Sequence, residues 1–415
     1  SNCWNGAPHR LSNGARVQED TLAGDRLCYT LLQGTGPHTG WVSLKFNGKQ
    51  LLERCEQKSA SAGSSSKVST AVVAPSALKL NEFRPPPKTL GGASKVIAAL
   101  DIATEASSAK VATQPVPTQP VANCPTVPPP AGDVDAPIFY LADESADPFY
   151  NVHQEDSSEE RMHAQFVQRV MPIKDGRRFA SNLSLDQQGV VLVPHRTALS
   201  TSEFYDHPEK VWDKYYAEMR ELLKKATGAS RVVVFAHHVR NQAVSHCRRG
   251  VQGYVGYAHN DYTPESAPKR VKDIATPSGA CEQSIEQKVR DLAGPRVLED
   301  EVEQVLEHRR FLILHAWRNI SDAPIYADPL TVCDGQSFDE KDYVPFDLMY
   351  KDSVGQTFGV RHAPSHEWLY FSGMCKHEVM IFKCYDSKTD RGVRWGAHTA
   401  FSDPRTPEDA PKRES

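Results

Sequence analysis

The chain has 415 residues, enough for two domains or for one large domain with appendages. Its 48 basic and 52 acidic residues nearly balance, and the sequence has no Lys/Arg-rich run of the kind that indicates a nucleic-acid partner. The apolar runs fall short of the ~20 residues of a membrane span, and 9 scattered cysteines without a CxxC pair favour a soluble protein of a reducing, intracellular compartment. Since the chain begins at Ser1, the sequence does not decide whether a targeting segment precedes it.

Residues 1–55 are expected to form a small β module. Two runs of alternating apolar and polar residues flank Gly-rich turns, and Asn47-Gly48 is a hairpin signal. The stretch GWVSLKFNGKQLL resembles a small SH3-like barrel, and a hairpin docked on the main body explains the same pattern equally well. Either arrangement makes residues 1–55 the candidate site for a protein partner.

Residues 56–135 have a different composition, rich in Ser, Ala, Pro and Thr with few large apolar side chains. Such a segment cannot bury enough surface to offset its ordering entropy, so we expect a disordered linker that is extended where Pro dominates. Within it, the stretch GASKVIAALDIAT at 92–104 is expected to form a short helix.

Residues 136–415 have the pattern of a globular domain. LSLDQQGVVLVPH predicts a strand, HPEKVWDKYYAEMRELLKKATGAS predicts a helix that ends at Gly228, and RVVVFAHHVR predicts a strand. Two helices are expected at 283–293 and 297–309, followed by strands in RFLILHAWRNI, EWLYFSG and EVMIFKCYDS. This order favours a β-sandwich or barrel with buttressing helices.

The stretch GYVGYAHNDYT, residues 253–263, contains a candidate metal site. If it forms a strand, His259 and Asp261 point to the same face, because side chains alternate with a period of two. An imidazole and a carboxylate are two ligands of a facial triad, and one further His completes it with open positions on the metal, as in non-haem Fe(II) oxygenases. A closed structural zinc site would need four protein ligands, usually including Cys.

Other histidines compete for these roles. The His-Gln-Glu of 153–155 lies in an acidic segment, and the His-Pro-Glu of 207–209 begins a helix, so neither has a strand context. The candidates for the third ligand are His308, His315, His362, His366, His377 and His398. His315 lies within an apolar strand and His398 is flanked by small residues, and spacing alone does not choose between these two.

Seven segments follow one another along the chain: SLDQQGV, YYAEMRELLKKATGASRVVVFAHHVR, AHNDYT, HAWRNISDAPIYADPLTVCDGQS, HEWLYFSGMCKHEVMIFKCYDS, GAHTAFSDPRTPEDAP and the terminal RES. In these segments and in their order, the chain resembles the hydroxylase/desaturase family of Fe(II)/2-oxoglutarate-dependent oxygenases. The resemblance implies a mainly β fold with buttressing helices, built on a double-stranded β-helix (jelly-roll) core over residues 136–415. It also implies Fe(II), 2-oxoglutarate as co-substrate, and O2.

The resemblance also assigns residues. GAHTAF occupies the family's distal-histidine position, which implies that iron binds to His259, Asp261 and His398, with no catalytic side chain beyond the metal centre. Arg413 and Ser415 resemble the Arg-x-Ser pattern that grips the far carboxylate of 2-oxoglutarate. A planar guanidinium pairs bidentately with a carboxylate, and a hydroxyl adds a third hydrogen bond.

Further assignments are open. Trp317 and Arg318 fall where the family shows Asn-x-Trp-Arg, so His315 stands in place of an Asn. Arg318 is a second candidate for binding the co-substrate, with a salt bridge to Asp334 as the alternative. Four aromatic residues are candidates for lining an apolar substrate pocket, with core packing as the alternative: Tyr257, Tyr262, Trp317 and Tyr370.

The implied function is hydroxylation or desaturation of a small, mostly apolar metabolite with release of succinate and CO2. The alternative is a non-catalytic partner subunit or scaffold of an oxygenase complex, although a scaffold has no need to keep all of His259, Asp261, His398 and Arg413. Metal-assisted hydrolysis on the same triad is a second alternative, and it gives no reason for the terminal Arg-x-Ser.

Overall fold

The computed structural model describes residues 129–415 except 146, 153–161, 246, 249, 276–296, 351–352 and 391. It also describes residues 97–102 and short strands within 3–50. Backbone contacts divide the chain into two units, one of residues 1–89 and 243–249 and one of residues 90–242 and 250–415.

The first unit contains short antiparallel strands. They are β1 (Cys3–Trp4), β2 (Ala7–Pro8), β3 (Arg16–Ala23), β4 (Arg26–Gln33), β5 (Thr39–Ser43), β6 (Lys45–Phe46) and β7 (Lys49–Gln50). β3, β4 and β5 form a three-stranded sheet, and β6 pairs with β7 across Asn47-Gly48, which confirms the predicted hairpin. The resemblance to an SH3-like barrel stays a prediction.

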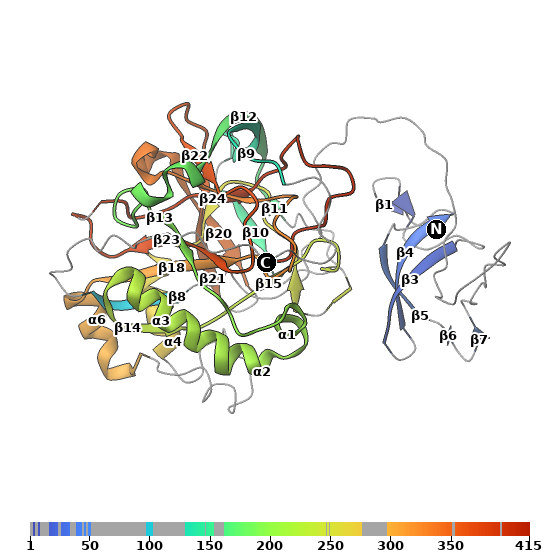
Figure 1. Ribbon diagram of the computed structural model, residues 1–415, viewed down its shortest axis with the longest axis horizontal. Helices are drawn as coiled ribbons and strands as arrows, with labels where there is room; N and C mark the ends of the chain where they lie inside the picture. The colour runs from blue at the N-terminus through green and yellow to red at the C-terminus, as the bar shows by residue number, and fades with distance from the viewer. Residues whose placement is uncertain are drawn as a thin grey trace. The chain divides into compact units, whose positions relative to one another are not determined.

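The second unit is built on two sheets (Figure 1). The larger has ten strands in the order β11-β10-β20-β21-β17-β24-β19-β22-β12-β9. Their bounds are β9 (Val134–Leu141), β10 (Phe149–Asn151), β11 (Met162–His163), β12 (Phe166–Asp175), β17 (His259–Asn260), β19 (Leu330–Cys333), β20 (Tyr343–Met349), β21 (Val354–Val360), β22 (Trp368–Tyr370) and β24 (His398–Ala400). The sheet curls, since the N–H of Ala258 donates to the carbonyl of Phe139 on the edge strand β9 at 2.8 Å.

The smaller sheet has five strands in the order β13-β23-β18-β8-β14, all antiparallel to their neighbours. Their bounds are β8 (Ile97–Ile102), β13 (Val190–Pro194), β14 (Ala229–Val234), β18 (Phe311–Arg318) and β23 (Glu378–Asp386). β15 (Val239–Arg240) and β16 (Val251–Gln252) form a separate parallel pair. The strands predicted in RVVVFAHHVR, RFLILHAWRNI, EWLYFSG and EVMIFKCYDS are confirmed, while LSLDQQGVVLVPH is a strand only in its second half.

Helices lie outside the sheets, and Figure 1 shows α1 to α4 along one side of the second unit. Their bounds are α1 (Thr201–Asp206), α2 (Pro208–Lys210), the π-helical turn η2 (Val211–Tyr215), α3 (Tyr216–Thr227), α4 (Ser266–Ala275) and α6 (Val302–His308), with 3-10 turns η1 (Gly176–Asn182), η4 (Glu299–Glu301), η5 (Gly335–Ser337) and η6 (Glu340–Asp342). α3 ends as predicted at Gly228, whose φ of 70° is the left-handed conformation that glycine adopts without strain. The helix expected at 297–309 is confirmed by η4 and α6, and the one at 283–293 lies outside the described residues.

The hydrophobic core draws on both sheets. Ile313 and Phe382 of the smaller sheet belong to one continuous cluster with Val332 and Trp368 of the larger sheet, each at most 1% exposed. A core shared by the inner faces of both sheets is expected where two sheets pack face to face. The fold is therefore mainly β with buttressing helices, as the sequence predicts.

The helix expected at 92–104 is wrong, because residues 97–102 form β8 inside the smaller sheet. Leu100 lies opposite Arg231 of β14 on one side and opposite Phe311 of β18 on the other. Ala and Leu favour helix locally, but a segment that pairs on both edges gains ladder hydrogen bonds that outweigh this weak preference. A strand of the second unit thus lies inside the range that composition assigns to the linker.

We expect this strand to be essential for stability. A fragment of residues 90–415 should unfold cooperatively. A fragment of residues 133–415 leaves β14 without its neighbour in the sheet and β18 paired only with β23, and it should melt at least about 10 °C lower. Thermal unfolding followed by far-UV circular dichroism compares the two fragments. Equal midpoints would show that β8 contributes little to the sheet.

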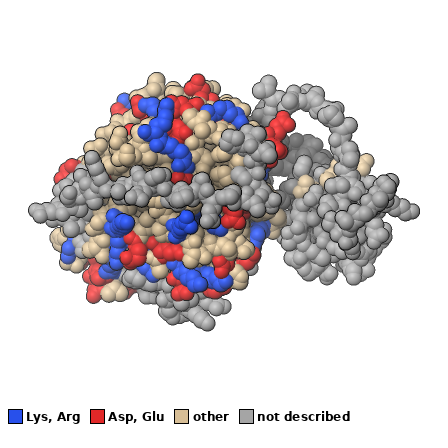
Figure 2. All heavy atoms as spheres, in the orientation of Figure 1, with Lys and Arg blue, Asp and Glu red and all other residues tan. Residues whose placement is uncertain are grey.

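The surface carries mixed charge. On the face drawn in Figure 2, basic and acidic side chains of the second unit are interspersed, in keeping with the balanced composition. Within the described part of the chain, no helix combines the length and apolar character needed to cross a membrane.

Candidate active site

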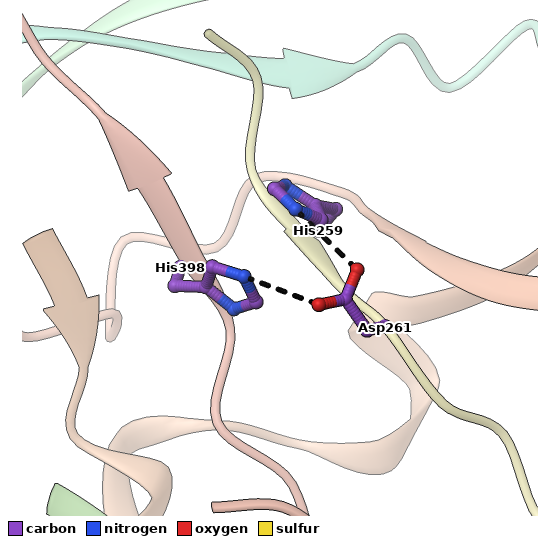
Figure 3. A group of neighbouring side chains, drawn as sticks. All are labelled: His259, Asp261 and His398. Carbon is purple, nitrogen blue, oxygen red and sulfur yellow. Dashed lines mark ion pairs between the residues drawn. The ribbon is translucent and has the colours of Figure 1, made fainter. Parts of the chain in front are cut away.

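Two neighbouring strands of the larger sheet bring His259 and His398 together. His259 begins β17, His398 begins β24, and the two residues are direct partners in the antiparallel register. Directly opposite side chains share a face of the sheet, and here the imidazole centroids lie 4.3 Å apart. Asp261 follows β17 two residues after His259, and its carboxylate points to the same side (Figure 3).

Asp261 lies between the two imidazoles. Its Oδ1 is 3.8 Å from Nε2 of His259, and its Oδ2 is 3.7 Å from Nε2 of His398. One donor atom from each of the three residues lies within 4.8 Å of the others, and all three residues are buried. Two imidazoles and one carboxylate on one face form the facial set that leaves positions on an iron open for other ligands.

Backbone carbonyls fix the tautomer of both histidines. Nδ1 of His259 lies 2.8 Å from the carbonyl oxygen of Tyr257, and Nδ1 of His398 lies 3.2 Å from that of Gly396. A carbonyl only accepts, so each Nδ1 carries a hydrogen, and in the neutral imidazole each Nε2 then faces Asp261 with its lone pair. Histidine ligands of metal ions are commonly oriented by this kind of hydrogen bond.

The charge states also suit a metal. Burial alone would raise the pKa of Asp261, but the imidazoles of His315, His398 and His259 hold that pKa well below its usual value. Burial and the neighbouring His259 lower the pKa of His398 well below its usual value. The group is therefore an ionised carboxylate with a neutral His398, as metal binding requires.

His315 reaches the same carboxylate from the other sheet. It lies on β18, and its Nε2 is 2.8 Å from Oδ2 of Asp261. The two atoms lie at hydrogen-bond distance. Neither has a hydrogen-bond partner within the described residues, so the angles between the two groups do not suit a hydrogen bond. Asp261, His315 and Cys384 form a second group of donor atoms within 4.8 Å of one another. His315 and His398, the two candidates for the third ligand between which spacing alone does not choose, therefore both lie beside Asp261.

The last residues of the chain are part of the second unit. The N–H of Arg240 donates to the carbonyl of Ser415 at 2.6 Å, and the N–H of Ser415 donates to the carbonyl of Arg240 at 2.9 Å. Glu414 bridges to Asn241 and accepts a hydrogen bond from the N–H of Ile320 at 3.0 Å. Backbone pairing on both sides therefore fixes Arg413 and Ser415 in the fold.

Arg413 is a buried cation, 5% exposed. Its Nη1 donates to the carbonyl oxygen of Asp328 at 2.5 Å, and its guanidinium lies over the rings of Tyr254 and Trp317 at 4.9 and 5.7 Å. Burial lowers the pKa of Arg413 to about 10. Nε of Arg413 and Oγ of Ser415 are buried without a hydrogen-bond partner among the described residues, so both are suited to receive a carboxylate ligand.

Arg318, the second candidate for the co-substrate, is engaged elsewhere. Its Nε donates to the hydroxyl of Tyr215 at 3.1 Å, its Nη1 donates to the carbonyls of His195 and Lys376, and its Nη2 lies 2.6 Å from Nδ1 of His195. The alternative salt bridge to Asp334 is not formed either, since that carboxylate caps η5 through the N–H of Gln336. These partners tie β18 to η2 and to the loops that contain His195 and Lys376.

Two of the four aromatic candidates lie beside the site residues. The ring of Tyr257 is 5.5 Å from that of His259 and 4.4 Å from that of Phe166. Trp317 lies under the guanidinium of Arg413. These two side chains give the surroundings of the metal group and of Arg413 an apolar, aromatic character.

The other two aromatic candidates have different surroundings. Tyr262 is buried in the hydrophobic core. The hydroxyl of Tyr370 donates to the carbonyl of Gly132 at 2.8 Å and accepts from Arg405 at 3.0 Å. These contacts hold Gly132, just before β9, against β22.

Sequence reasoning missed Tyr254 and Asp328. Tyr254 lies in the same GYVGYAHNDYT stretch as His259, so its nearness to that motif was the available signal. Asp328 adopts a left-handed φ of 49° while its carbonyl accepts from Arg413, and nothing in its local sequence marks it. Of the competing motifs, His207 contacts Glu209 on the surface at 2.9 Å, and 153–155 lies outside the described residues.

Comparisons with known proteins agree on one family. The family model described as "Oxidoreductase/YMDC permease-like domain" matches residues 138–292 and 280–415. The hydroxylase/desaturase efuI of Hormonema carpetanum is 31% identical over 255 residues, which cover 59% of this chain and 79% of the relative. The chain belongs to the hydroxylase/desaturase family of Fe(II)/2-oxoglutarate-dependent dioxygenases.

A second relative supports the assignment, and a solved structure supports the fold. The alpha-ketoglutarate-dependent dioxygenase tstK of Talaromyces stipitatus is 27% identical over 249 residues, covering 59% of this chain and 82% of the relative. The solved structure of the iron and alpha-ketoglutarate-dependent endoperoxidase NvfI superimposes with a TM-score of 0.56 at 22% identity, covering 68% of this chain and 95% of that chain. The likeness confirms the predicted jelly-roll fold.

Family membership decides the class of function. The chain is an Fe(II)/2-oxoglutarate-dependent dioxygenase that uses Fe(II), 2-oxoglutarate and O2. The homologues support this catalytic function over that of a non-catalytic partner subunit or scaffold.

Proposed function

We propose that this dioxygenase hydroxylates or desaturates a small, mostly apolar metabolite, with iron bound by His259, Asp261 and His398. The observation that carries the metal site is the direct cross-strand pairing of His259 with His398 beside the buried carboxylate of Asp261. We also propose that Arg413 and Ser415 bind the far carboxylate of 2-oxoglutarate through the buried Nε and Oγ.

When bound, the iron, 2-oxoglutarate and O2 supply the oxidant, and succinate and CO2 leave as products. The side chains hold this chemistry in place. The backbone carbonyls hold Nδ1–H of His259 and of His398, which leaves Nε2 of each ring to bind the metal. Burial of the three ligands keeps bulk water from the centre, which strengthens the electrostatic interactions within it.

The neighbouring side chains favour an apolar substrate. The rings of Tyr257 and Trp317 lie beside His259 and Arg413. Aromatic walls with few polar groups are typical of sites that bind apolar small molecules. We further propose that the β module of residues 1–55 is the part of the chain that binds a protein partner.

Anaerobic binding of Fe(II) and 2-oxoglutarate tests the metal and co-substrate sites together. We expect the visible charge-transfer band of an iron-bound 2-oxo acid when both are added to the purified protein. Succinate is the control, because it lacks the keto oxygen needed to chelate the metal. Absence of the band at millimolar 2-oxoglutarate would contradict the proposed function.

A further inference from the structure

His315 is held in a fixed orientation beside the proposed metal site. On β18 it is the direct partner of Phe382 of β23, and the two rings stack with centroids 4.8 Å apart and planes 14° apart. Stacking between antiparallel strands restricts the imidazole plane. The side chain of His315 is 15% exposed, so the ring is packed by its neighbours rather than by water.

The two oxygens of Asp261 have different neighbours. Oδ1 has Nε2 of His259 at 3.8 Å, while Oδ2 has Nε2 of His315 at 2.8 Å and Nε2 of His398 at 3.7 Å. Both Oδ2 of Asp261 and Nε2 of His315 are buried without a hydrogen-bond partner among the described residues. Their separation already equals a hydrogen-bond length, so the bond requires a change of angle and no closer approach of the two atoms.

We propose that His315 is a positioning residue whose Nε2–H donates to Asp261 and limits that carboxylate to one oxygen on the metal. This inference rests on the proposed metal site of His259, Asp261 and His398. A carboxylate binds a metal through one oxygen or through two, and a two-oxygen mode takes an additional coordination position. A donor that occupies the second oxygen keeps the positions for 2-oxoglutarate and O2 open.

Co(II) is a suitable probe, because it is stable in air and reports its ligands spectroscopically. The matched pair of variants is His315→Gln and His315→Met, whose side chains have nearly the same length and differ in the amide donor. We expect His315→Met to weaken Co(II) binding by about 10- to 100-fold, the usual effect of losing a partner that orients a ligand. His315→Gln should stay within about threefold of wild type, because its amide nitrogen reaches the position of Nε2.

A third variant separates donation from stacking. His315→Phe keeps the ring against Phe382 without a donor, so its Co(II) affinity should match that of His315→Met. Thermal unfolding of the metal-free variants checks that each is folded. The comparison of Co(II) affinities needs only one folded variant with a donor and one folded variant without a donor. Equal affinity of wild type and His315→Phe would overturn the proposal, as would equal weakening in His315→Gln and His315→Met.

Paramagnetic proton spectra of the Co(II) protein test whether His315 is itself a ligand. We expect two strongly shifted exchangeable signals, from the Nδ1–H groups of His259 and His398, in wild type and in His315→Gln. A third such signal that disappears in His315→Gln would make His315 a ligand and overturn the positioning role. If the wild-type protein fails to bind Co(II), the proposed metal site itself is wrong, whereas tight wild-type binding with unaffected variants overturns only the role of His315.

Discussion

Alanine in place of His259 or Asp261 is expected to abolish Fe(II)-dependent conversion of 2-oxoglutarate to succinate while the fold is retained. Each change removes one of the three donor atoms that lie within 4.8 Å of one another. Loss of a direct ligand should weaken iron binding by more than the ~100-fold that a residue supporting a ligand contributes. Succinate formation and Fe(II) binding in each variant provide the measurement.

The same experiment includes His398 and a matched control. His398→Ala should remove iron binding, whereas His315→Ala should weaken it without removing it. His207→Ala is the control, because His207 also precedes an acidic residue by two positions but pairs with Glu209 on the surface. Full succinate production by His259→Ala or Asp261→Ala would exclude this site. Loss of binding in His315→Ala with retention in His398→Ala would reverse the assignment of the third ligand.

Arg413→Ala is expected to raise the apparent 2-oxoglutarate requirement by about 30-fold or more. A buried guanidinium that pairs with a carboxylate contributes on the order of 2 to 5 kcal/mol, much of it the penalty for leaving the partner charge unpaired. At about 1.4 kcal/mol per tenfold change, the lower limit corresponds to roughly 30-fold. Arg413→Lys should recover only part of the loss, because an ammonium cannot form the bidentate pair.

Several comparisons make this test specific. Fe(II) affinity should change little in Arg413→Ala, because Arg413 is not a metal ligand. Lys412→Ala removes an equal charge from an exposed neighbouring position and should leave the 2-oxoglutarate requirement unchanged. Arg318→Ala should lower stability, since its donors hold Tyr215, His195 and Lys376. A wild-type requirement in Arg413→Ala together with a raised one in a folded Arg318→Ala would move the carboxylate anchor to β18.

Local features of the site and fold follow from the sequence. The period of two along an extended chain is sufficient to place His259 and Asp261 on one side. Gly228 ends α3 because glycine adopts a left-handed φ without strain, and Asn47-Gly48 separates two short paired strands. In each case the interactions that decide the outcome lie within a few residues, so they can be inferred from neighbouring letters.

Nonlocal features needed the family resemblance or the tertiary structure. The choice of His398 depends on the register of β24 against β17, which joins residues far apart in the chain. The contact of His315 with Asp261 requires the smaller sheet to pack onto the larger one, and spacing carries no information about that packing. Resemblance pointed to His398 but left the role of His315 open.

The positions of β8 and of Arg413 likewise could not be predicted from the local sequence. The composition around residues 97–102 favours a linker with a short helix, yet pairing with β14 and β18 makes this segment a strand inside a sheet. The terminal Arg-Glu-Ser has the composition of a solvated tail, yet pairing with Arg240 and Asn241 buries Arg413 next to Tyr254 and Trp317. The local sequence determined which groups are available for chemistry, whereas strand pairing between distant segments decided which of these groups meet. The reason is that ladder hydrogen bonds and burial depend on partner strands, which the neighbouring residues do not specify.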